Sequence, residues 1–294
     1  VYAWIDEELE KAKIKTPMNL EANDFFKKDT ARIIGYINGY KPQAGFKTGI
    51  VYTGNVLTRE DYPSVVEIFE DGRFECKLPL SYPINSSMWL KDVSIGFYIE
   101  PGQTLAVLLD WDEFLLADRY RNRRYVFNDI LFIGPLAQVN TEITEAKRRI
   151  EPVDARDIYR NGMKKKLEDF IPYIHSMTAK YEQAIGEFIK EKSLQPTTRT
   201  VLYYYNIVSK STYLMDYASE YSYNYKYTER LPLSLYDFFQ GMPLKTTHLL
   251  LSNEFSTFIS RSEYCAPLWQ ANVLYKPEIK NPATNHDLSL FREH

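Results

Sequence analysis

The hydrophobic period of the chain changes near Gly134, and this change limits the folds that the chain can adopt. Between residues 30 and 134, short apolar runs alternate with polar residues and are separated by turn residues, as in β-strands. After residue 135, apolar residues recur at intervals of three and four, the spacing of helices that bury one face. The sequence therefore predicts an α+β fold, in which an N-terminal antiparallel β-sandwich is followed by an all-α helical region.

The strand signal is clearest in "VVEIFEDGRFECKL", where two alternating runs flank Asp71-Gly72. This dipeptide favours the tight turn of a β-hairpin. In the second run Phe74, Cys76 and Leu78 face the same side of the strand. We therefore expect Cys76 to be buried and to have a raised thiol pKa.

Further strands are expected from other short apolar runs in this half. They are "TARIIGYI" at residues 30–37, "SIGFYI" at 94–99, "TLAVLLD" at 104–110 and "DILFIG" at 129–134. The second and third of these runs flank Pro101-Gly102, a pair of turn residues. Several short strands at this spacing are typical of antiparallel sandwiches and barrels, and we predict the sandwich.

Helical spacing begins at Pro135, and proline is favourable in a first helical turn. Leu167, Ile171 and Ile174 belong to one apolar stripe. Pro172 lies within that stripe and should either kink the helix or divide it into two. Further helices are expected at residues 197–221, 234–240 and 253–264.

The chain length allows about two domains, since 294 residues exceed the roughly 100–200 of a single one. We expect an N-terminal extension at residues 1–29, a β-sandwich domain at 30–134 and an α-helical domain at 135–294. The net charge of −3 and the pI near 5.9 do not favour binding to nucleic acid. No apolar run reaches the roughly 18 residues of a membrane helix, so no membrane span is expected in this chain.

Three carboxylates surround an indole in "LLDWDEF", where an apolar strand ends. On a strand, Asp110 and Asp112 would point to the same side, and glycosidases use such carboxylate pairs. Acidic residues also collect at solvated strand ends because they favour turns. We favour the strand end, with Asp110, Asp112 and Glu113 leading into the loop before the basic segment "DRYRNRRY". That segment is interpreted as an exposed hairpin rather than as a surface for phosphates or bases.

No motif assigns a catalytic, cofactor-binding or metal-binding residue. The two cysteines, Cys76 and Cys265, are far apart in the chain and form no CxxC, and we expect no disulfide between them. Glycine-rich dinucleotide and P-loop signatures are absent from the sequence. No two histidines have the i, i+4 spacing of a helical metal site. We therefore expect neither a cofactor nor a metal.

Tyrosine is unusually frequent, with 24 Tyr against 16 Phe and 4 Trp. Tyr and Trp combine an apolar ring with a polar group, which suits them to binding surfaces. Trp111 and the helically spaced Tyr213, Tyr217 and Tyr221 are the weak candidates for a ligand surface. For the tyrosines we favour the competing interpretation, in which large aromatic rings pack wherever they bury area.

The segments "FEDGRFECKLPL", "FYIEPGQTLAVLLDWDEF" and "FIGPLAQVNTEI" follow one another in this order, and "LSNEFSTFISRSEY" occurs later. Together they resemble the N-terminal region of TlpA-type, thioredoxin-like thiol-disulfide oxidoreductases of Bacteroidetes. The resemblance covers most of residues 30–265. It implies a β-sandwich and a helical segment that precede a C-terminal thioredoxin-like domain. It also implies a location in the cell envelope, either periplasmic or lipid-anchored.

The functional residues of that family are the CxxC cysteines of the thioredoxin-like domain, and no position of this chain matches them. Either such a domain follows residue 294 or this member lacks it. The resemblance therefore implies a non-catalytic accessory region, which positions the redox domain or recognises its protein clients. The alternative is a carbohydrate- or peptide-binding module that uses surface aromatics. An independent hydrolase built on Asp110 and Asp112 ranks last.

Overall fold

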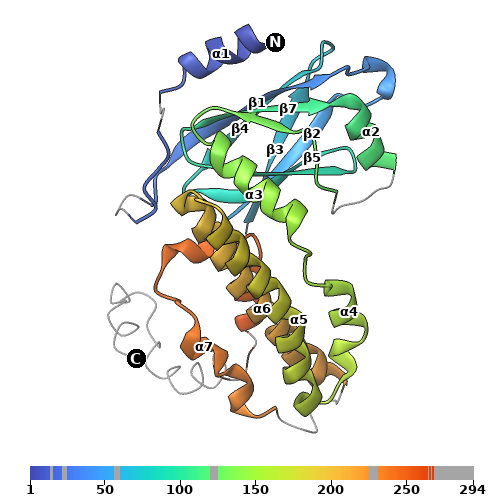
Figure 1. Cartoon of the computed structure of the whole chain (residues 1–294), viewed down its shortest axis with the longest axis vertical. Coiled ribbons are helices and arrows are strands. Elements are labelled where there is room, and N and C mark those ends of the chain that lie inside the picture. The colour runs from blue at the N-terminus through green and yellow to red at the C-terminus, as the bar shows by residue number, and fades with distance from the viewer. Residues whose placement is uncertain are drawn as a thin grey trace, which may run out of the picture.

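The computed structural model describes residues 1–13, 16–21, 25–55, 60–119, 125–224, 231–263, 265 and 267. A curled sheet forms one half of the molecule and a group of helices the other (Figure 1). The strands are β1 (Asp29–Asn38), β2 (Thr48–Asn55), β3 (Glu60–Ile68), β4 (Arg73–Leu80), β5 (Ile84–Leu90), β6 (Val93–Ile99), β7 (Thr104–Asp110) and β8 (Leu131–Ile133). The α-helices are α1 (Tyr2–Glu10), α2 (Trp111–Arg119), α3 (Ala137–Arg149), α4 (Ala155–Arg160), α5 (Leu167–Glu191), α6 (Pro196–Asn224), α7 (Phe238–Gly241) and α8 (Phe255–Ser262). Short 3-10 helices are η1 (Pro42–Ala44), η2 (Gly162–Lys164), η3 (Leu233–Tyr236) and η4 (Thr247–Leu251).

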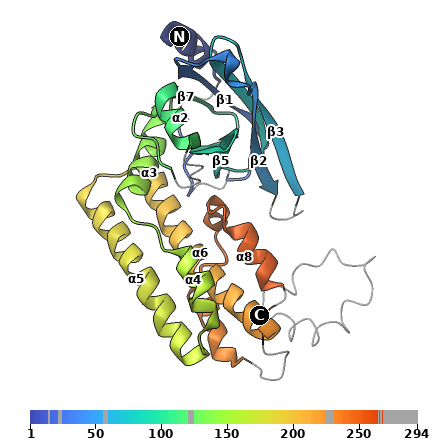
Figure 2. The same cartoon turned by 90° about the vertical axis from the view of Figure 1, so that its right-hand side faces the viewer.

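The strands of the described residues form one sheet in the order β6-β5-β2-β3-β4-β1-β7-β8. Most neighbours are antiparallel, but β1 and β7 run parallel, so the sheet is mixed. The α+β class is confirmed, whereas the antiparallel two-layer sandwich is not. Strands β6 and β7 follow one another through a four-residue turn, yet five strands lie between them in the sheet. The sheet therefore curls into a half-barrel that brings these strand ends together (Figure 2).

The hairpin predicted at Asp71-Gly72 is present between β3 and β4. Gly72 has a φ of +89°, a conformation that residues with a Cβ adopt only at a cost. In β4 the side chains alternate as expected, with Phe74 and Cys76 buried. The Cys76 side chain is 2% exposed, and burial raises the pKa of its thiol to about 12. The prediction for Cys76 is confirmed, and no disulfide joins it to the buried Cys265.

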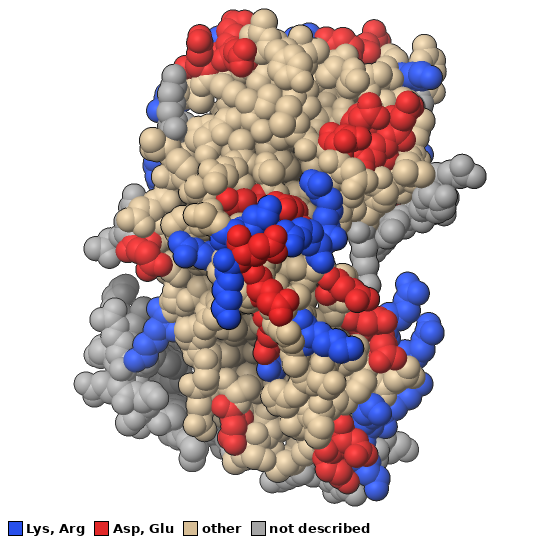
Figure 3. Space-filling model, in the orientation of Figure 1, with Lys and Arg blue, Asp and Glu red and all other residues tan. Residues whose placement is uncertain are grey.

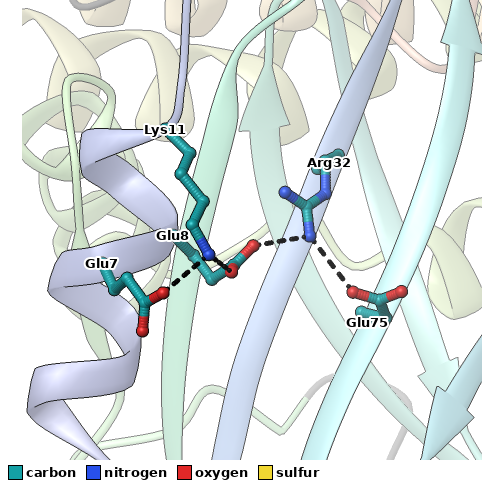
Figure 4. A network of polar contacts seen from close by, with 5 residues as sticks. All are labelled: Glu7, Glu8, Lys11, Arg32 and Glu75. Atoms are coloured by element: carbon teal, nitrogen blue, oxygen red, sulfur yellow. Dashed lines mark hydrogen bonds and ion pairs between the residues drawn. The ribbon is translucent and has the colours of Figure 1, made fainter.

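Helix α1 covers part of the outer face of the sheet, on the side opposite the other helices (Figure 1). Its Ile5 packs against Ile34 of β1. Beside this contact, Arg32 of β1 lies between Glu8 of α1 and Glu75 of β4, with N–O distances of 3.0 and 3.2 Å (Figure 4). Strand β1 therefore buries apolar residues on both faces, because the N-terminal helix packs onto the sheet at Ile34.

The inner face of the sheet and helix α3 share one hydrophobic core. Val139 and Ile143 of α3 pack with the buried strand residues, and Val201 of α6 joins the same cluster. Apolar side chains on the concave face and on one stripe of α3 are thereby removed from water together. The core thus crosses from the sheet into the helical half.

Two buried polar side chains of α3 strengthen this connection. The Asn140 side-chain oxygen accepts a hydrogen bond from Tyr98 N (2.7 Å), and its Nδ2 donates to Tyr98 O (2.9 Å). Both backbone groups of an edge-strand residue are thus satisfied by one side chain. Glu142 accepts hydrogen bonds from Gln195 N (3.0 Å) and Thr198 Oγ1 (2.5 Å) at the start of α6. Helix α3 therefore holds the sheet on one side and α6 on the other.

The long helices α5 and α6 lie side by side below α3 (Figures 1 and 2). Helix α5 is continuous through Pro172, so the division into two helices at that residue is not found. Pro172 lies in the second turn, where its missing N–H deprives only the Glu168 carbonyl of its helical partner. A second core joins α5 to α6, with Phe170 and Tyr217 among its fully buried side chains.

Charged side chains of both signs gather across the middle of the molecule (Figure 3). Two ion pairs here link α3 to the end of α5, one between Arg149 and Glu191 (2.6 Å) and one between Lys192 and Glu145 (2.8 Å). They are partly exposed, so they contribute little to stability. In the part of the chain that the structure describes, no helix is long and apolar enough to cross a membrane.

Candidate functional site

A cavity of about 400 Å³ lies between the sheet and the helices. Its walls come from β5 and β6, from residues 125–130, from α3 and the chain that follows it, and from α5 and α6. A wider and more open groove runs between Phe26 and His248. We take the first cavity as the candidate site because it is more enclosed and lies where the two halves meet, a common place for ligand sites.

Lys147 on α3 reaches into this cavity. A Cβ atom placed on Gly96 of β6 would lie 2.8 Å from the lysine Nζ, so the amine lies directly against the Gly96 backbone. The Lys147 side chain is exposed by surface area, so solvent reaches it through the open side of the cavity. Many protein atoms nevertheless lie around the amine. This desolvation lowers the pKa of Lys147.

The Lys147 amine has no hydrogen bond or ion pair with the residues that the structure describes. Its helical neighbour Arg149 differs, since its guanidinium lies 2.6 Å from a Glu191 oxygen. A cation that lines a partly enclosed cavity without an opposite charge from the protein is available to pair with an anion that enters it. Lys147 is therefore the chemically most informative group of the cavity.

Small polar side chains line the sheet wall of the cavity. Ser87 and Ser94 supply hydroxyl groups from β5 and β6, on the face of Gly96, whereas the Ser86 hydroxyl donates to Tyr52 O at 3.3 Å. The side-chain oxygen of Asn85 is buried, and no described atom donates a hydrogen bond to it. Hydroxyl groups can donate to an anion and also accept from a neutral ligand, so this wall is polar but carries no charge of its own.

The helical walls are aromatic and apolar. Tyr181 of α5 and Tyr205 of α6 meet at a centroid distance of 6.4 Å, and Tyr213 of α6 lines the same cavity. Burial raises the pKa of Tyr181 well above its usual range, so this phenol stays neutral at physiological pH. Leu202 and Ile150 add aliphatic surface. The cavity can therefore hold an apolar body beside its polar wall.

Glu254, the residue before α8, is the only carboxylate that lines the cavity in the described part of the chain. Burial raises its pKa, and the negative charge of Asp216 raises it further. Asp216 itself accepts hydrogen bonds from Tyr159 OH and from Arg261 Nε, each 2.6 Å long. Both effects disfavour the charged form of Glu254, which makes it a poor counter-charge for Lys147.

Two of the four aromatic candidates are not on the surface. Trp111 is 4% exposed and stacks on Phe114, with 5.4 Å between the ring centroids. Tyr217 is fully buried, stacks on Phe170 at 3.8 Å and donates a hydrogen bond to Lys165 O. Both rings are core residues, and apolar neighbours at helical spacing explain their burial.

The other two aromatic candidates, Tyr221 and Tyr213, lie in different places. Tyr221 is half-buried, and its ring lies 5.9 Å from that of Tyr217, at the edge of the second core. Tyr213 contacts the Tyr159 ring at 6.0 Å and lines the cavity. Of the four rings that the sequence suggested as a ligand surface, the structure places Tyr213 at the candidate site and the other three elsewhere.

The acids after β7 cap a helix. Asp110 ends the strand as expected, and its Oδ1 accepts hydrogen bonds from Asp112 N (2.9 Å) and Glu113 N (3.1 Å) at the start of α2. The expected loop is thus the helix α2. Glu113 in turn accepts hydrogen bonds from Tyr125 OH (2.9 Å) and Asp129 N (2.9 Å). These contacts are structural, and they favour the strand-end interpretation over a catalytic carboxylate pair.

Residues 120–124 of the basic segment lie outside the described residues. Within the described ranges, no group of three or more His, Cys, Asp or Glu side chains could hold a metal ion. Sequence reasoning did not identify Lys147, because it stands in the basic run at the end of α3, where lysine and arginine are usual. Gly96, which faces its amine, is the only local signal, since glycine within a strand often marks a close approach.

Comparison of the chain with protein-family models, with curated proteins and with solved structures found no match.

Proposed function

We propose that the chain is a non-catalytic accessory region of a thioredoxin-like thiol-disulfide oxidoreductase of the cell envelope, either periplasmic or lipid-anchored. In this function it positions the redox domain or recognises its protein client. The proposal starts from the four segments that resemble TlpA-type proteins. They contribute β4, the end of β6, β7, the start of α2, most of β8, the start of α3 and all of α8.

The observation that carries the proposal is the state of the two thiols. Thiol-disulfide exchange needs an accessible thiolate and a resolving partner. Cys76 is 2% exposed with a thiol pKa of about 12, and Cys265 is buried in the other core. These thiols are unsuited to exchange, so redox chemistry would have to come from a separate CxxC domain.

An insulin-reduction assay on the chain by itself tests the non-catalytic assignment. We expect no turnover above that of the Cys76→Ser/Cys265→Ser double variant, which serves as the background. Turnover above this background would overturn the assignment. The sequence encoded after residue 294 tests the redox context, which is supported by a CxxC within a thioredoxin-like domain and fails if the gene product ends without one.

The cavity supports a second candidate function, a ligand-binding module. The sequence suggested a ligand surface made of aromatic side chains. Of these, Trp111 and Tyr217 are buried in the core, whereas Tyr213 lines the cavity. A volume of about 400 Å³ falls within the roughly 300–1,000 Å³ of small-molecule pockets. Two aromatic probes test this candidate, the neutral N-phenyl-1-naphthylamine and the anionic 8-anilinonaphthalene-1-sulfonate, and absence of saturable binding of both would remove it.

A further inference from the structure

We propose that the cavity between the sheet and the helices binds a small organic anion with an apolar body, and that the anionic group pairs with the Lys147 amine. This inference rests on the second proposed function, ligand binding, and does not depend on the redox assignment. It adds the chemical class of the ligand and the residue that selects it.

The first argument is the uncompensated charge of Lys147. Its amine lies against Gly96 on the sheet side of the cavity, at 2.8 Å from the position of an added Cβ. Two other cations nearby have partners within the protein, Lys192 with Glu145 at 2.8 Å and Arg149 with Glu191 at 2.6 Å. A ligand anion would supply the missing partner, and a charge pair partly shielded from water is stronger than one in bulk solvent.

The second argument is the electric charge of the other side chains that line the cavity. The other titratable groups that line the cavity are Glu254 and the phenols of Tyr125, Tyr181, Tyr205 and Tyr213. Glu254 is disfavoured as an anion because burial and Asp216 raise its pKa. Burial likewise raises the pKa values of Tyr125 and Tyr181, which keeps these phenols neutral. The lining therefore favours a negative ligand over a positive one.

The third argument is that polar and apolar side chains lie on different walls of the cavity. Ser87 lies opposite Gly96 in the register of β5 and β6, and Ser94 lies two residues before Gly96, so their hydroxyl groups share a face with the Lys147 amine, whereas Leu202 and Tyr205 come from α6. An amphipathic anion can place its charged group beside the amine and the serines and bury its rings or aliphatic chain against α6. Apolar walls with few polar groups are the usual composition of such sites.

Two dyes with the same ring system test the proposal. 8-Anilinonaphthalene-1-sulfonate carries a sulfonate, and N-phenyl-1-naphthylamine has the same rings without it. Fluorescence titration should show that Lys147→Met weakens binding of the sulfonate dye by about tenfold or more, as expected for loss of a charge partner. The affinity of the neutral dye should change less than about twofold.

Three further variants serve as controls. Lys147→Arg keeps the charge and should retain most of the sulfonate affinity. Arg148→Met removes an exposed neighbouring charge and should change neither affinity. Ser94→Phe places a ring in the cavity and should weaken both dyes, which locates them there. If Ser94→Phe leaves both affinities unchanged, the dyes bind elsewhere and the proposal is overturned.

The remaining outcomes separate the inference from the function on which it rests. If Lys147→Met weakens neither dye, or both equally, the anion assignment fails while ligand binding stands. If wild-type protein binds neither dye, ligand binding and the anion assignment fail together. Circular dichroism of each variant shows whether it retains the wild-type fold, and any variant that has lost it is replaced by Lys147→Gln or Ser94→Leu.

Discussion

Replacing Asn140 by alanine should destabilise the protein strongly. The side chain is 1% exposed and satisfies both Tyr98 backbone groups, with hydrogen bonds of 2.7 and 2.9 Å. Alanine leaves one buried N–H and one buried C=O without a partner, and each such group costs about 1–3 kcal/mol. Two such groups would cost about 2–6 kcal/mol together. Because water can reach an edge strand when the side chain is removed, we expect a total in the lower half of this summed range, about 3 kcal/mol.

Urea unfolding followed by circular dichroism measures this loss. With a slope of about 3 kcal/mol per molar urea for a chain of this size, the midpoint should fall by about 1 M. Thr141→Ala is the matched control, because Thr141 is exposed and its hydroxyl bonds to Ala137 O within the same helix. The control should change stability by less than about 0.5 kcal/mol. If Asn140→Ala shifts the midpoint no more than Thr141→Ala does, then α3 does not hold the sheet edge in the way described.

Three other predictions concern capping, charge and thiol access. Asp110→Ala removes the N-cap of α2 and should lower the free energy of unfolding by about 1 kcal/mol, whereas Asp112→Ala in the same urea assay should cost less than half as much. Lys147→Met at pH 7 should raise the melting temperature by about 1–3 °C, because it removes a desolvated cation that solvent in the cavity partly screens. The pKa of Lys147 is lower in the folded than in the unfolded state, so the charged lysine destabilises the fold fully at neutral pH. This effect disappears as the pH rises above the unfolded-state pKa. The melting temperatures of wild type and variant should therefore converge at high pH. Cys76 should react with a thiol reagent at pH 8 only after unfolding, since burial holds its thiol pKa near 12; fast labelling of the native protein would contradict this.

Local patterns in the sequence predicted the features that depend on neighbouring residues. The α+β class follows from the two hydrophobic periods, and the Asp71-Gly72 turn follows from the glycine that its positive φ requires. Burial of Cys76 follows from the alternation of β4. In each case the residues that determine the structure lie within a few positions of one another.

Strand pairing could not be predicted in the same way, because it joins distant segments. The parallel contact between β1 and β7 brings together residues about 70 positions apart, such as Ile33 and Leu105. Alternation identifies a strand but not its neighbours, so it does not distinguish the mixed curled sheet from the predicted sandwich. Aromatic side chains such as Trp111 suit a surface and a core equally well until the packing partner is known.

The candidate site depends on distant segments even more strongly. Its walls come from two strands, four helices and the chain between them, and no local motif marks their meeting. Lys147 belongs to a run of three basic residues that ends α3, where cations are favourable for reasons unrelated to ligands. Its position against Gly96 distinguishes it from Arg148 and Arg149, and that position appears only when α3 packs under β6.

A crystal structure of the protein with 8-anilinonaphthalene-1-sulfonate tests the central claim about the cavity most directly. We predict that the dye lies between the sheet and α6, with a sulfonate oxygen about 2.8 Å from the Lys147 Nζ. Its rings should contact Tyr205 and Leu202. A dye bound in the open groove beside His248, or a dye in the cavity with its sulfonate turned away from Lys147, would contradict the claim.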